Sequence, residues 1–177
     1  MFSILYEALK NNSSYEIIEV EHSKISLAPN DLLTERNIKF DELIGFHNES
    51  GNSCKENVDT PGGYAIFTRM NSEIKPIIVI NIDPFHSNEE LSKDEDIISL
   101  SKYVTLLHEF GHIDDFENQI NFKLNPYSVN VDLTEAYAEI FTLKKLIKQT
   151  KLDSSILEKK ISQIALNKHV ERMINGL

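Results

Sequence analysis

The spacing of apolar residues divides the first third of the chain into helical, extended and polar segments. Residues Phe2 to Lys10 follow an amphipathic helical pattern, and Tyr15 to Val20 alternate imperfectly in the manner of a β-strand. A mixed stretch continues to Phe46, after which the polar stretch His47 to Gly63 ends in Pro61-Gly62-Gly63, a strong turn signal. The sequence therefore predicts a helix, a strand and then a surface loop.

A β-hairpin is predicted after this loop. Tyr64 to Thr68 and Ile77 to Asn81 are short apolar runs of strand-forming residues, and Asn71-Ser72-Glu73 between them supplies the turn. Pro76 stands at the start of the second run. Because proline has no backbone N–H to donate to a neighbouring strand, it indicates that the second run is an edge strand.

The rest of the chain is predicted to be mainly helical. Asp83 to Asp96 is a polar loop, and it leads into the main helix, where Val104, Leu107 and Ile113 keep a 3.6-residue period. After a loop from Asn121 to Asn130, a second helix extends from Leu133 to Ile147 and a third from Ile156 to Val170. No repeat or interdomain linker is visible, so residues 1–177 are expected to form a single α+β domain, with a small sheet packed on helices.

Composition and charge exclude several classes of partner. The chain has 28 acidic and 18 basic residues, a net charge of -10 and no run of Lys or Arg, so direct nucleic-acid binding is not expected. The N-terminal ten residues lack a basic lead and are interrupted by Glu7, and no apolar run approaches the length of a membrane span. The expected compartment is the cytoplasm, without a membrane partner. The single cysteine, Cys54, is interpreted as an incidental loop thiol.

One motif in the main helix carries candidate chemistry, His108-Glu109-Phe110-Gly111-His112. Because an α-helix advances about 100° per residue, its two histidines share one face and can bind one metal ion. Two solvated histidines on a surface helix are the alternative, but the flanking apolar residues place this helix in the core. A catalytic zinc site leaves one position for water, and Glu109 is the predicted base that takes a proton from that water. Glycine is unfavourable inside a helix, so Gly111 indicates that a backbone or a ligand approaches closely there.

The third ligand is predicted on the following helix, which offers Glu135 and Glu139 one turn apart. Glu135 is the preferred ligand, although Asp132 before it also allows a capping role at the helix start. Glu139 is expected to be a partly exposed carboxylate or a hydrogen-bond partner of a histidine. Ala136 and Ala138 are small enough for this helix to pack close to the first. The predicted cofactor is Zn²⁺, with His108, His112 and Glu135 as metal ligands.

Between Pro61 and Ile147 the chain resembles the ImmA/IrrE metallopeptidase family. Three features carry the resemblance: Pro61-Gly62-Gly63-Tyr64 with the strand Pro76 to Asn81, the helix Leu106 to His112, and Glu135 followed by Ala138 and Phe141. The resemblance implies that His108, His112 and Glu135 bind zinc. It also implies a zincin-like fold and cleavage of a protein partner such as a DNA-binding transcriptional repressor.

The predicted edge strand is the expected place for an extended substrate. An edge strand offers unpaired N–H and C=O groups, which can hold a scissile peptide straight beside the metal helix. The predicted substrate-binding residues are therefore Ile77, Ile78, Val79, Ile80 and Asn81.

Departures from the family's pattern leave the substrate open. The link between Asn81 and His108 is longer and more acidic than usual, and Ile113-Asp114-Asp115 stands where an apolar run is more usual. Two other functions stay open: a metalloprotease toxin or effector secreted without a leader, and a metal-stabilised module that binds a partner without cutting it. Glu109 argues against the binding module. The residue that stabilises the oxyanion is unassigned, and the candidates are Tyr127, Tyr137 and His86.

Overall fold

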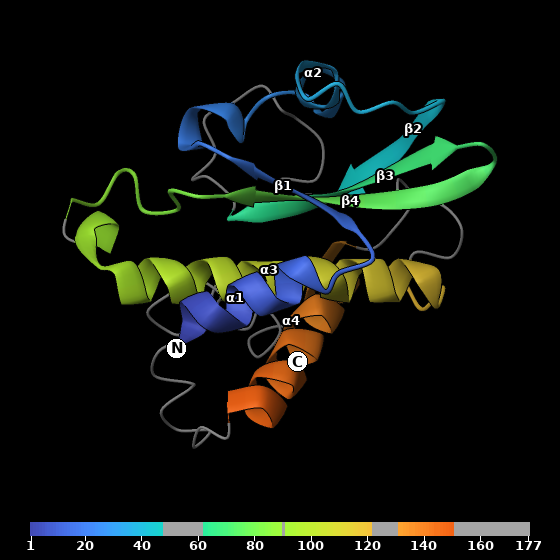
Figure 1. The fold of residues 1–177 in the computed structure, drawn as a ribbon. Coiled ribbons are helices and arrows are strands. Elements are labelled where there is room, and N and C mark those ends of the chain that lie inside the picture. Colours follow the sequence, from blue (N-terminus) through green and yellow to red (C-terminus); the bar gives the residue numbers. More distant parts are fainter. Residues whose placement is uncertain (48–61, 90, 122–130, 151–177) are drawn as a thin grey trace.

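The computed structural model describes residues 1–47, 62–89, 91–121 and 131–150 (Figure 1). Its helices and strands, in chain order, are α1 (Phe2–Asn11), β1 (Glu16–Val20), α2 (Pro29–Glu35), β2 (Glu42–His47), β3 (Gly63–Met70), β4 (Glu73–Asn81), α3 (Glu95–Glu117) and α4 (Val131–Thr150). Two short 3-10 helices, η1 (His22–Lys24) and η2 (Leu91–Lys93), complete the described elements. The predicted α+β class is confirmed.

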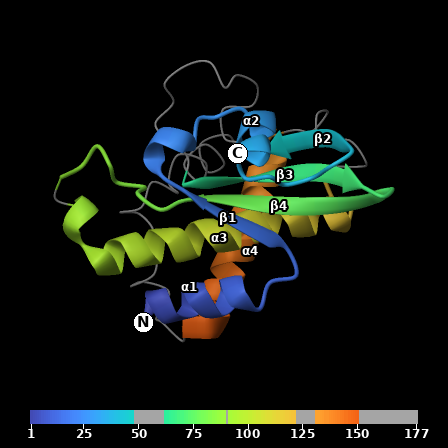
Figure 2. The same cartoon turned by 45° about the horizontal axis from the view of Figure 1, so that its top comes forward.

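The four strands form one mixed sheet in the order β1-β4-β3-β2. β1 is parallel to β4, while β3 pairs antiparallel with both β4 and β2. The sheet lies between helices: α2 covers one face, α1 and α3 lie against the other, and α4 crosses α3 on the side away from the sheet (Figures 1 and 2).

Both faces of the sheet are buried, which explains the unbroken apolar run in β4. One face contributes Ala65, Phe67, Ile78 and Ile80 to a core with α1 and α3. The other contributes Tyr64, Ile66, Ile77 and Val79 to a second core with Leu32 and Leu33 of α2. Among the residues that the structure describes, no helix is long and apolar enough to cross a membrane.

The predicted helix Phe2 to Lys10, the strand Tyr15 to Val20 and the hairpin correspond to α1, β1 and the β3–β4 pair. The mixed stretch before Phe46 contains α2 and β2, which its pattern did not predict. The predicted third helix, Ile156 to Val170, lies outside the described residues. So do Cys54, most of the predicted loop His47 to Gly63 that contains it, and most of the predicted loop Asn121 to Asn130.

The prediction that Ile77 to Asn81 form an edge strand is wrong. β4 lies between β1 and β3, and Glu16 to Val20 pair in register with Ile77 to Asn81. The prediction failed because the pairing of β4 with β1 begins at Ile77, one residue after Pro76. The N–H that proline lacks is therefore not needed for the hydrogen bonds between β1 and β4. Ile77, Ile78, Val79, Ile80 and Asn81 are each at most 3% exposed. With both backbone edges paired and the side chains packed, this segment offers no free edge to a substrate strand, which removes the basis on which these residues were predicted to bind substrate.

The turn signal before β3 has a packing role. A Cβ atom on Gly63 would lie 2.4 Å from the carbonyl oxygen of Val79 and 2.9 Å from the Thr105 side chain of α3. Only glycine therefore allows the start of β3 to lie this close to both β4 and α3. This contact fixes the sheet on α3 about one helical turn before Glu109.

Candidate metal centre

The two motif histidines and the predicted glutamate converge in space. The Nε2 atom of His108 lies 3.0 Å from Nε2 of His112 and 3.0 Å from Oε2 of Glu135. Nε2 of His112 lies 3.4 Å from Oε1 of Glu135. One potential ligand atom from each residue lies within 4.8 Å of the others, so the group could hold a metal ion.

These separations fit a tetrahedral metal. Two ligand atoms about 2.0–2.1 Å from a zinc ion lie about 3.3 Å apart at the tetrahedral angle. The two Nε2 atoms lie 3.0 Å apart, and each lies close to a different oxygen of Glu135, Oε2 at 3.0 Å from His108 and Oε1 at 3.4 Å from His112, so all three separations are near that value. Two imidazole nitrogens only 3.0 Å apart also repel each other unless a proton or a cation lies between their lone pairs. The donor set therefore suits a shared cation.

The electrostatic surroundings also favour a cation. His108, His112 and Glu135 are 9%, 1% and 1% exposed. Burial lowers the pKa of the His108 imidazole, but the hydrogen bond and charge of Glu135, with the charges of Glu109 and Glu139, outweigh burial and raise it to about 9. These carboxylates thus stabilise positive charge at the site, which also favours the binding of a cation.

Glu109 lies next to His108 on α3 and is only 4% exposed. Its charge contributes to the raised pKa of the His108 imidazole. A buried carboxylate beside a metal position can accept a proton from a water molecule there. Its location is consistent with the predicted role of a general base.

Glu139 is also buried, at 4% exposed, which excludes the first of its two predicted roles, a partly exposed carboxylate, and leaves the second, a hydrogen-bond partner of a histidine, as a prediction. Its charge acts on His108, yet Glu139 does not belong to the three residues whose ligand atoms converge. The structure therefore brings together His108, His112 and Glu135 and leaves Glu139 beside them.

The close packing expected of α3 and α4 is present. A Cβ atom on Gly111 would lie 2.6 Å from Cα and 3.0 Å from Cβ of Ala138. The first distance is too short for any side chain at position 111 unless the backbone of α4 moves away. The glycine inside the motif is thus explained by the backbone of α4, whose approach carries Glu135 to the two histidines.

No protein-family model, curated protein or solved structure matches this chain. Membership of the ImmA/IrrE family therefore stays a prediction.

The acidic residues that depart from the family's pattern have structural partners. Asp114 accepts a hydrogen bond of 2.5 Å from the hydroxyl of Tyr137 on α4. Asp115, which is fully buried, accepts bonds from the backbone N and the side-chain Nδ2 of Asn121 at 2.7 and 3.1 Å. These contacts were not predicted. The bond between Asp114 and Tyr137 depends on how the two helices cross, whereas Asp115 binds the segment that directly follows α3.

The described candidates for oxyanion stabilisation are engaged elsewhere. The hydrogen bond to Asp114, with burial and nearby acidic charge, raises the pKa of Tyr137 to about 12 and directs its hydroxyl to α3. His86 contacts Asp83 at 2.9 Å and stacks on His22 with ring centroids 4.6 Å apart. Tyr127 lies outside the described residues.

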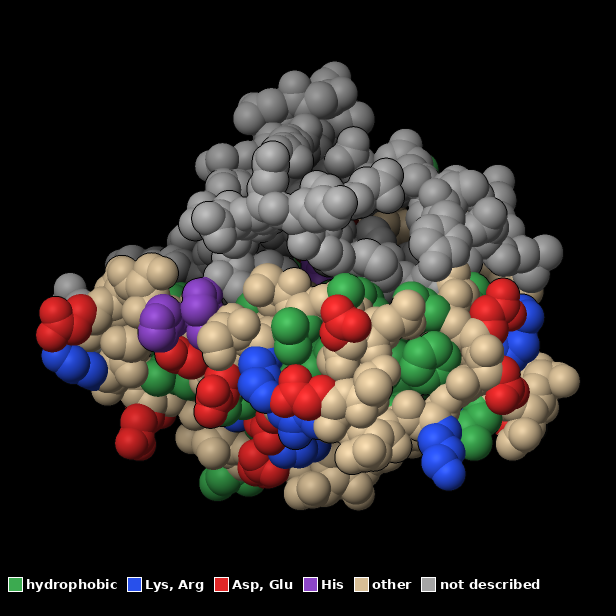
Figure 3. Space-filling view, turned by 90° about the horizontal axis from the view of Figure 1, so that it is seen from above, with side chains coloured by type: hydrophobic (Ala, Val, Ile, Leu, Met, Phe, Trp, Pro, Cys, Tyr) green, Lys and Arg blue, Asp and Glu red, His purple; other side chains and the backbone are tan. Residues whose placement is uncertain are grey.

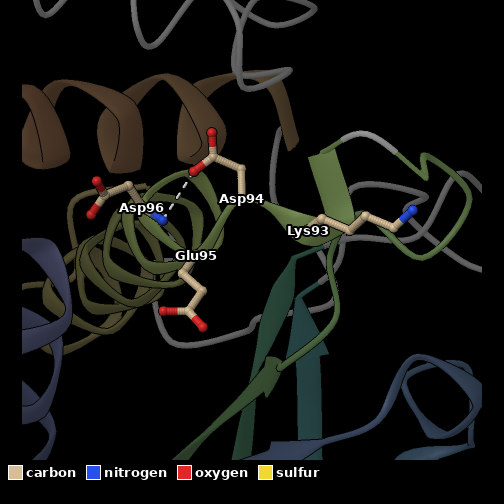
Figure 4. A pocket seen from close by; sticks show the side chains of 4 residues that line it. All are labelled: Lys93, Asp94, Glu95 and Asp96. Carbon is tan, nitrogen blue, oxygen red and sulfur yellow. Dashed lines mark hydrogen bonds between the residues drawn. The ribbon is translucent and has the colours of Figure 1, made fainter.

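A second acidic group lies at the start of α3, where Lys93, Asp94, Glu95 and Asp96 line an open hollow (Figure 4). The Asp94 carboxylate accepts hydrogen bonds from the backbone N atoms of Asp96 and Ile97, both at 3.1 Å. Asp94 therefore caps the helix, and the cluster is separated from His108 by about 20 Å of α3.

The described surface seen from above carries acidic and basic side chains intermixed (Figure 3). No continuous stripe of Lys and Arg is visible on that face among the residues that the structure describes. This arrangement offers no phosphate-binding track there.

Proposed function

We propose that this protein is a zinc-dependent endopeptidase that hydrolyses a peptide bond in a protein partner. The observation that carries the proposal is the convergence of His108, His112 and Glu135 beside the buried carboxylate of Glu109. Two imidazoles and one carboxylate are a donor set that suits zinc, whereas magnesium and calcium prefer oxygen ligands.

The number of ligands favours catalysis over a purely structural site. Structural zinc sites are closed by four protein ligands, while catalytic sites use three and leave a position for water. Among the residues that the structure describes, three meet at this point. A module that only binds a partner would need no carboxylate at Glu109, so this residue also favours hydrolysis.

The chain's own groups have distinct roles in the proposed reaction. Zinc bound at this site would supply a Lewis acid that lowers the pKa of a water molecule to about 7. His108, His112 and Glu135 fix the site between α3 and α4. Glu109 accepts the proton of the attacking water and delivers it to the departing amine.

Metal content and proteolysis, measured together, test the proposal. We expect the purified protein to contain one zinc per chain and to cut proteins in a cell lysate, with cutting blocked by a chelator and restored by zinc. Glu109→Gln should keep zinc and bind the same substrates without cutting them. A zinc-loaded wild-type protein that captures a partner but never cuts it would support the binding module and contradict the proposed enzyme.

The proposed substrate class is a DNA-binding transcriptional repressor, as the resemblance to the ImmA/IrrE family implies. A repressor encoded beside the gene is the first substrate to test, with a chelated sample and Glu109→Gln as controls. Cleavage of unrelated lysate proteins with the neighbouring repressor left intact would contradict this substrate class while leaving the peptidase activity established.

A further inference from the structure

α3 and α4 cross at a point where neither helix has a bulky side chain. Gly111 and Ala138 bring the two backbones almost into contact, since a Cβ on Gly111 would meet Cα of Ala138 at 2.6 Å. Interlocking side chains normally fix how one helix is rotated against another. A glycine and an alanine provide little interlocking, so contacts on either side of the crossing must set the rotation of α4.

Two polar contacts made by α4 flank this crossing. Glu135 reaches Nε2 of His108 at 3.0 Å, and the Tyr137 hydroxyl donates to Oδ2 of Asp114 at 2.5 Å. Because a helix advances about 100° per residue, Glu135 lies about 60° to one side of Ala138 and Tyr137 about 100° to the other.

The partners on α3 are arranged in the same way. His108 lies about 60° to one side of Gly111 and Asp114 about 60° to the other. The two contacts therefore hold opposite flanks of both helices, and a rotation of α4 that shortens one would stretch the other.

We propose that Tyr137 is a positioning residue whose hydrogen bond to Asp114 holds α4 in the rotation that presents Glu135, and not Glu139, to the metal. Glu139 lies about 40° from Glu135 around α4, on the side away from Tyr137, and one turn further along the helix. A rotation that brought Glu139 into the direction of Glu135 would turn Tyr137 away from α3 and break its bond to Asp114. The bond thus opposes the exchange of ligands.

This inference rests on the proposed zinc site, and metal affinity tests it without any substrate. Zinc dissociation constants are measured by competition with a chromophoric chelator for wild type, Tyr137→Phe, Asp114→Ala and the double variant. Tyr15→Phe is the matched control, because the Tyr15 hydroxyl donates to Glu117 of α3 at 3.0 Å but lies outside α4. The absorption spectrum of the Co²⁺-substituted proteins reports the ligand geometry independently.

We expect Tyr137→Phe to weaken zinc binding about tenfold and to alter the Co²⁺ spectrum, as is typical when support for a metal ligand is lost. Tyr15→Phe should leave both unchanged. The double variant should be no weaker than either single variant, because both remove the same bond. Thermal unfolding of metal-free Tyr137→Phe confirms that it folds.

Wild-type zinc affinity and an unchanged Co²⁺ spectrum in Tyr137→Phe would overturn the positioning role, as would losses that add in the double variant. Those results would leave the zinc site intact. A wild-type protein that binds no zinc would instead overturn the metal centre, and with it both proposals.

Discussion

The backbone of α3 at Gly111 lies against Ala138 of α4 so closely that a Cβ on Gly111 would be 2.6 Å from the Cα of Ala138. This relationship joins the helix that carries both histidines to the helix that carries Glu135. The spacing between the two helices therefore governs whether the three potential metal ligands meet.

Gly111→Ala should weaken both folding and metal binding. The added methyl group must push α4 away, and overpacking of this kind costs about 1–3 kcal/mol, which exceeds the gain of up to about 1 kcal/mol in helix propensity. We expect a lower free energy of unfolding in denaturant titrations and incomplete zinc loading. Ala138→Gly, which adds no atom to the crossing, is the control for the zinc measurement. Full zinc occupancy in Gly111→Ala would show that the helices can separate without losing the site.

Glu109→Gln should separate metal binding from catalysis. Glutamine retains the size of glutamate but cannot accept the proton, so we expect zinc content and thermal stability like those of wild type. Proteolysis should fall by about a hundredfold to ten-thousandfold. Turnover at the wild-type rate would exclude Glu109 as the base.

The two buried glutamates of α4 should differ in their effect on metal content. Glu135 lies 3.0 Å from His108 and belongs to the converging group, whereas Glu139 lies outside that group. We expect Glu135→Ala to lose most zinc and Glu139→Ala to keep it with reduced affinity. Elemental analysis of the two purified variants decides the matter. An empty Glu139→Ala beside a fully loaded Glu135→Ala would reverse the assignment of the ligand.

A carboxylate outside the candidate metal site should contribute to acid sensitivity. Burial raises the pKa of the Glu19 carboxyl, but hydrogen bonds from Lys10, Lys102 and Tyr6 outweigh burial and lower it from 4.5 to about 2. Because the folded-state pKa is the lower one, Glu19 stabilises the fold above pH 4.5, and this contribution is lost as the pH falls towards 2.

Glu19→Gln should therefore lower the free energy of unfolding at pH 7 by about 1–3 kcal/mol, with the difference from wild type shrinking between pH 4.5 and 2. Denaturant titrations across this pH range measure the effect. Glu16→Gln, at an exposed position of the same strand, is the control and should change little. A constant difference at all pH values would mean that ionisation of Glu19 is not the cause.

The sequence by itself determined the local features of this protein. An amphipathic period marked α1, a turn between two apolar runs marked the β3–β4 hairpin, and the i, i+4 spacing placed His108 and His112 on one face of a helix. These predictions succeed because they depend on backbone geometry over a few residues, which the side chains at those positions dictate.

Tertiary structure decided how these local features combine. Pro76 indicated an edge strand. However, β1, which lies far from β4 along the chain, pairs parallel with β4 and places it inside the sheet. The choice of Glu135 over Glu139 follows from the angle and height at which α4 crosses α3, as does the bond between Tyr137 and Asp114. Such contacts join residues far apart in the chain, and their geometry is set by the packing of whole elements against one another, which no local pattern encodes.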